Sequence, residues 1–219
     1  EIYTLSLHDA LPIYFRTAFA ANKRFTLVID PGHGGHDAGA LGTISKEKNI
    51  NLAVALRFGK YVEQNLPEVR VIYTRKTDVF IPLNERANIA NRANADLFIS
   101  VHTNALPAGK IARGFETYTL GMHRAKDNLD VAMRENSVIS MEKDYQQRYQ
   151  GFDPRSSESY IIFEFIQGKN MERSVELARM IQRGVCDGAN RPDKGVHQAG
   201  FLVLRETSMP GCLIELGFI

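Results

Sequence analysis

Cysteine, net charge and long apolar runs are all scarce in this sequence, and each shortage excludes a class of protein. Two cysteines in 219 residues, Cys186 and Cys212, are too few for a disulfide scaffold or a cysteine-built zinc site. The formal net charge is +2, whereas binding nucleic acid through bulk charge needs a concentrated basic surface. No apolar run approaches the roughly 18 residues of a membrane span, so we expect no transmembrane segment.

Several well-known ligand-binding and catalytic motifs are also missing. A dinucleotide-binding G-x-G-x-x-G loop starting at Gly32 would need glycine at position 37, where the chain has Asp37. The sequence contains neither a G-x-x-x-x-G-K-[ST] phosphate loop nor a serine in a nucleophile-elbow pattern. What remains is an ordinary globular composition, 44% hydrophobic and 24% charged, with a length that suits one domain.

The two ends of the chain differ in pattern from its middle. Residues 1–22 are expected to lie outside the fold as a foreign or signal-derived segment. Residues 1–14 resemble read-through of a sequencing adapter, and Ala18-Phe19-Ala20 has the small-x-small form of a signal-peptidase site. At the other end an apolar strand stops at Ile219 with nothing to close it, so we expect a C-terminal truncation. The domain itself is predicted to span residues 23–219.

Between these ends, short apolar runs alternate with segments of helical spacing. Strands are predicted over residues 25–30, 69–73, 96–102, 114–120, 201–204 and 212–216. Helices are predicted over residues 47–65, 82–93 and 170–188, and the first is expected to bury the face formed by Ile50, Val54, Phe58 and Val62. A polar helical stretch, residues 123 to about 168, is interpreted as an insertion. This order predicts a single α/β domain with a mostly parallel twisted sheet and helices on both faces.

Polar residues stand where the predicted strands end. His33 follows the first strand, His102 ends the third and Glu215 lies in the last. In open α/β sheets, ligands bind outside the carboxyl ends of the strands. Glu47 opens the helix after a glycine-rich loop. Two histidines and a glutamate form a known catalytic zinc set that leaves one position for water, and another carboxylate could be the base that acts on that water.

Each of these residues also has a simpler explanation. A histidine after a strand is most often a hydrogen-bonded loop residue, and Glu47 could merely complement a helix dipole. Glu215 is harder to explain in this way, because it lies between Ile214 and Leu216, where an unpaired carboxylate is costly. We predict that it is the only buried-strand carboxylate near the site.

Four blocks of sequence, taken in order, resemble one family. The blocks are Val28-Ile29-Asp30-Pro31-Gly32-His33-Gly34-Gly35, Lys46-Glu47-Lys48-Asn49-Ile50-Asn51, Ser100-Val101-His102-Thr103-Asn104 and Glu215-Leu216-Gly217-Phe218. Together they closely resemble the zinc-dependent N-acetylmuramoyl-L-alanine amidases, the cell-wall hydrolases that separate daughter cells.

This resemblance implies a site, a substrate and a location. His33, Glu47 and His102 would bind Zn²⁺, and Glu215 would be the catalytic base. The substrate would be peptidoglycan, cut at the amide between N-acetylmuramic acid and L-alanine. The protein would be exported to the periplasm or cell envelope of a bacterium.

The inserted segment holds a further candidate residue. One helix is predicted from His123 to Lys143. Within it, Val131, Glu135 and Val138 have i, i+4, i+7 spacing, so Glu135 shares a helix face with two valines. On its own, this pattern is that of a solvated charge beside partly exposed valines. Cell-separating members of the family carry a helical insertion over the active site that offers a glutamate to the zinc, and Arg134-Glu135-Asn136-Ser137 resembles that segment. The resemblance therefore implies autoinhibition through Glu135, relieved by a protein activator.

Some alternatives stay open on the sequence alone. Asn104 alternates to the same strand face as His102, and it either orients the site or is a simple turn residue. The chain could instead be a zinc peptidase that acts on cell-wall peptides. It could also be a non-catalytic wall-binding module with a dead site, although all four expected site residues are present.

Overall fold

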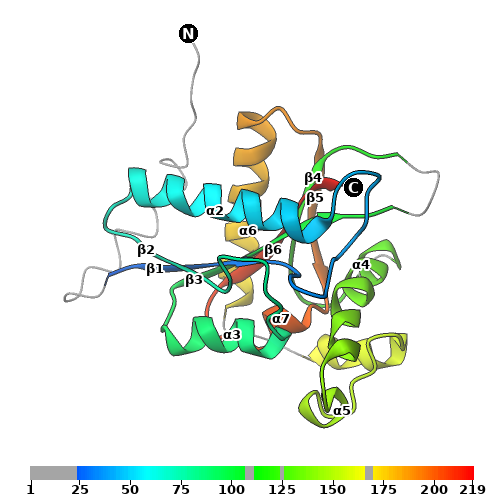
Figure 1. The fold of residues 1–219 in the computed structure, drawn as a ribbon. Helices are drawn as coiled ribbons and strands as arrows, with labels where there is room; N and C mark the ends of the chain where they lie inside the picture. Colours follow the sequence, from blue (N-terminus) through cyan, green and yellow to red (C-terminus); the bar gives the residue numbers. More distant parts are fainter. Residues whose placement is uncertain (1–23, 107–110, 124–125, 166–169) are drawn as a thin grey trace.

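The computed structural model describes residues 24–106, 111–123, 126–165 and 170–219. The expectations for residues 1–22, including the signal-peptidase motif, lie outside these described residues. Figure 1 shows a twisted central sheet with helices packed on either side of it. No helix within the described ranges combines the length and apolarity that a membrane span requires.

Six strands form one sheet in the order β2-β1-β3-β6-β4-β5. Their bounds are β1 (Thr26–Pro31), β2 (Arg70–Tyr73), β3 (Leu97–Asn104), β4 (Phe115–Leu120), β5 (Asp193–Ala199) and β6 (Gly211–Phe218). The neighbours β2, β1, β3 and β6 run parallel, whereas β4 is antiparallel to β6 and parallel to β5. The prediction of a single α/β domain with a mostly parallel sheet is confirmed.

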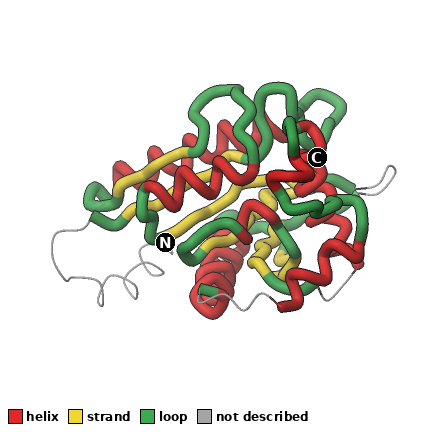
Figure 2. Tube along the Cα trace, turned by 90° about the horizontal axis from the view of Figure 1, so that it is seen from below, coloured by secondary structure: helices red, strands yellow, loops and turns green. Residues whose placement is uncertain are grey.

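Helices cover both faces of this sheet, each over its own apolar core (Figures 1 and 2). Helices α2 (Glu47–Asn65) and α6 (Met171–Gly188) share one face, whereas α3 (Leu83–Arg92) and α7 (Leu202–Arg205) lie on the other. Adjacent residues of β1 alternate between the two cores, with Ile29 facing α2 and Val28 facing α3. The carboxyl ends of β1, β3 and β6 therefore share one edge, from which the site is built.

The predicted insertion is helical but consists of short elements. These are α4 (Lys126–Asn136), η1 (Ser137–Met141), α5 (Tyr145–Arg148) and η2 (Ser157–Phe165), with η1 and η2 being 3-10 helices. The helix expected from His123 to Lys143 is therefore shorter than predicted, since α4 ends at Asn136 and the chain tightens into η1.

Side-chain hydrogen bonds attach the insertion to the rest of the domain. Asn136 donates to the Gly200 carbonyl at 2.7 Å and accepts from the Leu202 amide at 2.9 Å. A second attachment joins Glu142 to the start of α3, where the Leu83 amide donates to its carboxylate at 3.2 Å. These bonds fix α4 over the edge of the sheet where the site lies.

Three details of the prediction were wrong. Residues 202–204 belong to helix α7 and Phe201 precedes it, because a short buried apolar run has no period that separates strand from helix. Strand β5 was missed because its sequence, DKGVHQA, is polar and partly exposed at a sheet edge. On α2, Val54 is exposed and the buried face runs through Ala55 and Gly59, where the missing side chain lets Tyr73 approach.

Candidate metal centre

The loop after β1 holds His33 in an unusual backbone conformation. Its φ is +60°, in the left-handed region that non-glycine residues seldom adopt. Two buried arginines donate hydrogen bonds to the carbonyl oxygens of this loop. Arg86 donates to the carbonyls of Pro31 and His33, each at 2.8 Å, and Arg75 donates to those of Pro31 and Gly32 at 2.9 and 2.8 Å. The strained conformation is therefore held by the surrounding structure.

Arg86 is in turn fixed by a buried ion pair with Asp30. The Asp30 carboxylate accepts from Arg86 at 2.8 Å and from the Ser100 hydroxyl at 2.7 Å, and its side chain is 1% exposed. Burial alone raises the pKa of Asp30, but Arg86 and the hydroxyl donors outweigh burial and lower that pKa below its ordinary value. The charge pair therefore links the core of β1 to the loop that carries His33.

His102 and Glu47 are oriented by close packing and by backbone donors. Gly32 lies against the His102 ring, where a Cβ would come within 2.3 Å of Nε2, so Nδ1 is the ring nitrogen that faces the site. Glu47 is the first residue of α2. Its Oε1 accepts from the Thr103 amide at 3.0 Å and its Oε2 accepts from the Ala40 amide at 2.8 Å.

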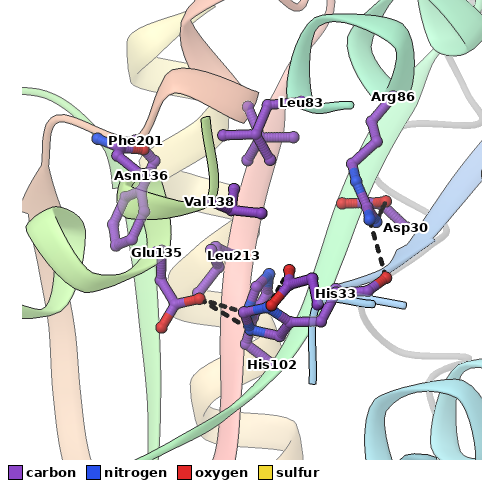
Figure 3. A pocket seen from close by; sticks show the side chains of 13 residues that line it. Asp30, His33, Leu83, Arg86, His102, Glu135, Asn136, Val138, Phe201 and Leu213 are labelled. Carbon is purple, nitrogen blue, oxygen red and sulfur yellow. Dashed lines mark hydrogen bonds and ion pairs between the residues drawn. The ribbon is translucent and has the colours of Figure 1, made fainter. Parts of the chain in front are cut away.

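Four buried side chains converge on one point: His33, Glu47, His102 and Glu135. One ligand atom from each lies within 4.8 Å of the others. Glu47 Oε1 is 3.1 Å from His33 Nε2 and 3.2 Å from His102 Nδ1. Glu135 Oε2 is 3.1 and 3.0 Å from the same two nitrogens (Figure 3).

The electrostatics of this cluster are those of two opposed charge pairs. Burial lowers the pKa of His102, but Glu135 and Glu47 outweigh burial and raise it to about 9. Burial and the Glu135 charge raise the pKa of Glu47, but the two histidines outweigh both and lower it to about 2. A divalent cation can replace the two imidazolium protons without changing the total charge.

The donor set fits a metal ion. His33 Nε2, His102 Nδ1 and Glu135 Oε2 are buried, and none has a hydrogen-bond partner of correct geometry among the described residues. The other nitrogen of His33, Nδ1, lies 2.7 Å from an Asp37 carboxylate oxygen, the arrangement that commonly orients a metal-binding histidine. Nitrogen and oxygen donors of this kind suit zinc among the common metals.

Glu215 lies beside the cluster. It is fully buried in β6 and pairs in register with His102 of β3. Neither of its carboxylate oxygens has a hydrogen-bond partner within the described part of the chain. Burial, followed by repulsion from Glu135, raises the pKa of Glu215 well above its ordinary value.

The comparisons with known proteins now bear on this site. A family profile described as N-acetylmuramoyl-L-alanine amidase matches residues 27–219. The chain belongs to this amidase family. Among solved structures, an N-acetylmuramoyl-L-alanine amidase from Clostridium difficile 630 is 29% identical with a TM-score of 0.63, covering 90% of this chain and 81% of that one.

Curated amidases of Escherichia coli are similar along most of this chain. AmiA of strain K12 is 31% identical over 196 residues, which cover 88% of this chain and 65% of AmiA. AmiC of Escherichia coli O6:H1, strain CFT073, is 28% identical over 206 residues, covering 90% of this chain and 46% of AmiC. The chain thus spans less than two thirds of either relative.

The sequence did not predict two polar residues of this amidase-family site, Glu116 and Arg134. Glu116 of β4 is 8% exposed and pairs in register with Glu215, so the prediction that Glu215 is the only buried-strand carboxylate here is wrong. Asn104 donates its side-chain amide to Glu116 and is itself buried. Arg134, next to Glu135 on α4, reaches Asn104 and approaches Glu215. A carboxylate between Phe115 and Thr117 was the available signal for Glu116.

A cavity borders the cluster on the side away from α2 (Figure 3). Its polar lining includes both histidines, Glu135 and the buried pair of Asp30 and Arg86. Its apolar lining includes Leu83, Val138, Phe201 and Leu213. Val138 belongs to the insertion, so the amidase-family fold and its insertion jointly enclose this space.

Proposed function

We propose that this chain is the catalytic domain of a zinc-dependent peptidoglycan amidase. It would cleave the amide between N-acetylmuramic acid and the L-alanine of the stem peptide. The observation that carries the proposal is the convergence of His33, Glu47 and His102 on one point, with an unpartnered buried carboxylate, Glu215, beside it. Membership of the amidase family supports the substrate, and an exported, periplasmic or cell-envelope location is part of the same proposal.

His33, Glu47 and His102 would hold the zinc ion. Zinc, when bound, supplies a Lewis acid for the scissile carbonyl and lowers the pKa of water towards about 7. Asp37 keeps the proton of His33 on Nδ1, so Nε2 offers its lone pair to the site.

Glu215 is the proposed general base and general acid. It takes one proton from the attacking water and delivers that proton to the leaving nitrogen as the C–N bond breaks and the C–O bond forms. The products are the muramoyl carboxylate and an amine on L-alanine. Burial raises the pKa of Glu215, which suits a carboxyl group that must accept a proton and then release it.

We also propose that the resting fold is self-blocked. Glu135 is 5% exposed, and its carboxylate lies about as close to both histidines as that of Glu47 does. A carboxylate there takes the position that water and substrate need. Activity then requires α4 to leave, which is a two-state switch that a protein activator could bias.

The nature of the products tests the amidase assignment against its alternatives. Purified peptidoglycan is incubated with the zinc-loaded Glu135→Ala variant, and the products are identified by mass spectrometry. An amidase releases peptides with L-alanine amino ends and leaves the glycan strands intact. A zinc peptidase leaves L-alanine attached to muramic acid, and a non-catalytic module binds the wall and releases nothing. Either of the last two results would overturn the assignment.

A further inference from the structure

Arg134 places its guanidinium group between Glu135 and the end of β3. Its Nε donates to Glu135 Oε1 at 2.9 Å. Its Nη1 donates to the Ala105 carbonyl at 3.2 Å, and its Nη2 donates to Asn104 Oδ1 at 2.9 Å. The same Nη2 lies 3.8 Å from Glu215 Oε1. One cation therefore covers a group of oxygen acceptors immediately beside the proposed base.

The neighbours of Asn104 fix which end of its amide faces this cation. Its Nδ2 donates to Glu116, whose carboxylate can only accept. Its Oδ1 accepts from the Ala105 amide at 2.7 Å and from Arg134. All three contacts require the same orientation, with the amide oxygen turned towards Arg134. Glu116 is thus a positioning residue that keeps an acceptor, and not a donor, on the side of the site where Glu215 lies.

When α4 leaves, these acceptors lose their donor. Asn104 Oδ1 then keeps only its bond from the Ala105 amide, so it and the Ala105 carbonyl each have a lone pair free for a new donor. The scissile amide brings its own donors to this place. Its nitrogen carries one N–H before cleavage, two as the free amine and three as the ammonium ion, whereas the carbonyl side of the bond carries none.

We propose that Asn104 Oδ1 and the Ala105 carbonyl form the subsite for the leaving-group nitrogen, beside Glu215, and that Arg134 occupies this subsite in the resting fold. This inference rests on the proposed amidase function and deepens it. Hydrolysis of the amide yields one carboxylate and one ammonium group. Helix α4 presents the same pair in adjacent residues, the Glu135 carboxylate at the metal cluster and the Arg134 guanidinium at the amine subsite.

Binding of a small amine to an opened site tests this inference without relying on turnover. The Arg134→Ala/Glu135→Ala variant is titrated by calorimetry with L-alaninamide, which carries the ammonium group of the product. N-acetyl-L-alaninamide, which lacks that group, is the control ligand. We expect L-alaninamide to bind the opened variant at least tenfold more tightly than it binds the wild-type chain or than the control ligand binds the opened variant.

Substitution of Asn104 then locates the bound amine. Asn104→Ala in the opened variant should weaken L-alaninamide binding about tenfold, the worth of one hydrogen bond to a charged group. Asn88→Ala, on the exposed face of α3, is the matched control and should change nothing. Equal affinity with and without the Asn104 side chain would overturn the subsite.

A second pair of variants tests the same subsite in case Asn104→Ala does not fold. Glu116→Leu frees the Asn104 amide to rotate and should weaken binding of the amine, whereas Glu116→Gln keeps an acceptor for Asn104 Nδ2 and should restore most of it. Equal binding in both Glu116 variants would contradict the positioning role.

Parallel measurement of muropeptide cleavage separates the two proposals. Amine binding that depends on Asn104, without cleavage by the opened variant, would contradict the amidase function and leave the amine subsite standing. Cleavage by the opened variant, with amine binding that does not depend on Asn104 or Glu116, would contradict the amine subsite and leave the amidase function standing.

Discussion

Glu135 Oε2 lies 3.0 Å from His102 Nδ1, although the two residues come from the insertion and from the central strand of the sheet. Burial raises the pKa of Glu135, but His102 and Arg134 outweigh burial and lower that pKa well below its ordinary value. The carboxylate is therefore ionised and directed at the atoms that the family resemblance assigns to the metal. This contact therefore connects the proposed zinc site to the helix that we propose inhibits it.

Removing a histidine ligand should remove the metal. His102→Ala deletes one of the four converging donor atoms, so we expect the zinc content after dialysis to fall to a small fraction of one per chain. His36→Ala is the matched control, because His36 is exposed and packs on Phe80 away from the cluster. The zinc content of both variants is measured by mass spectrometry, and full zinc occupancy in His102→Ala would refute the ligand assignment.

Glu215→Gln should separate metal binding from turnover. The amide has nearly the same volume and is neutral, so zinc should be retained, but it cannot accept the water proton. We expect turnover of muropeptides in the Glu135→Ala background to fall about a hundredfold or more. Near-normal turnover at unchanged zinc content would exclude Glu215 as the base.

Gly32 is predicted to be intolerant of even one methyl group. A Cβ there would lie 2.3 Å from His102 Nε2 and 2.4 Å from Cε1, so the ring has to move. Gly32→Ala should weaken zinc binding and lower the melting temperature. In the control Gly184→Ala, on α6, the added Cβ meets nothing within 4 Å and should stabilise the helix by up to about 1 kcal/mol. Equal zinc affinity in both variants would show that the ring can shift freely.

The Asp30–Arg86 pair should control stability in acid. The pKa of Asp30 is lowered from 3.8 in the fold, so its stabilising effect is complete above that value and is lost as the pH falls through the folded pKa. Asp30→Asn leaves Arg86 without its buried countercharge and should cost about 3–5 kcal/mol at neutral pH.

Urea unfolding at several pH values measures this effect. Asp187→Asn, an exposed change on α6, is the control. The stability lost between pH 5 and the folded pKa should be smaller in Asp30→Asn than in the control. Identical acid profiles would contradict the role given to the pair.

The sequence predicts some parts of this site well for a physical reason. His33 and His102 follow apolar β-branched runs, and parallel strands bring their carboxyl ends to one edge, so local pattern is enough to place these residues together. Glu215 is similarly marked by its apolar neighbours. These three residues can therefore be predicted without knowing which distant segments contact each other.

Other parts depend on contacts that no local pattern contains. Glu116 reaches the site because β4 pairs antiparallel beside β6, and the order of the strands is not visible in the composition of β4. Arg134 has the pattern of an exposed helical charge until α4 is attached through Asn136 to the start of α7. Helix α7 itself was mistaken for a strand because residues 201–204, which include most of it, are all apolar and buried.

The central claim is a zinc amidase held shut by its own helix, and the rate of peptidoglycan cleavage by Glu135→Ala relative to the wild-type chain tests it most directly. Both proteins are loaded with zinc, and the release of L-alanine amino ends is followed with and without a chelator. The account predicts at least tenfold faster release by Glu135→Ala, abolished by the chelator and restored by added zinc. Equal rates in the two proteins at equal zinc content, or release that survives the chelator, would contradict it.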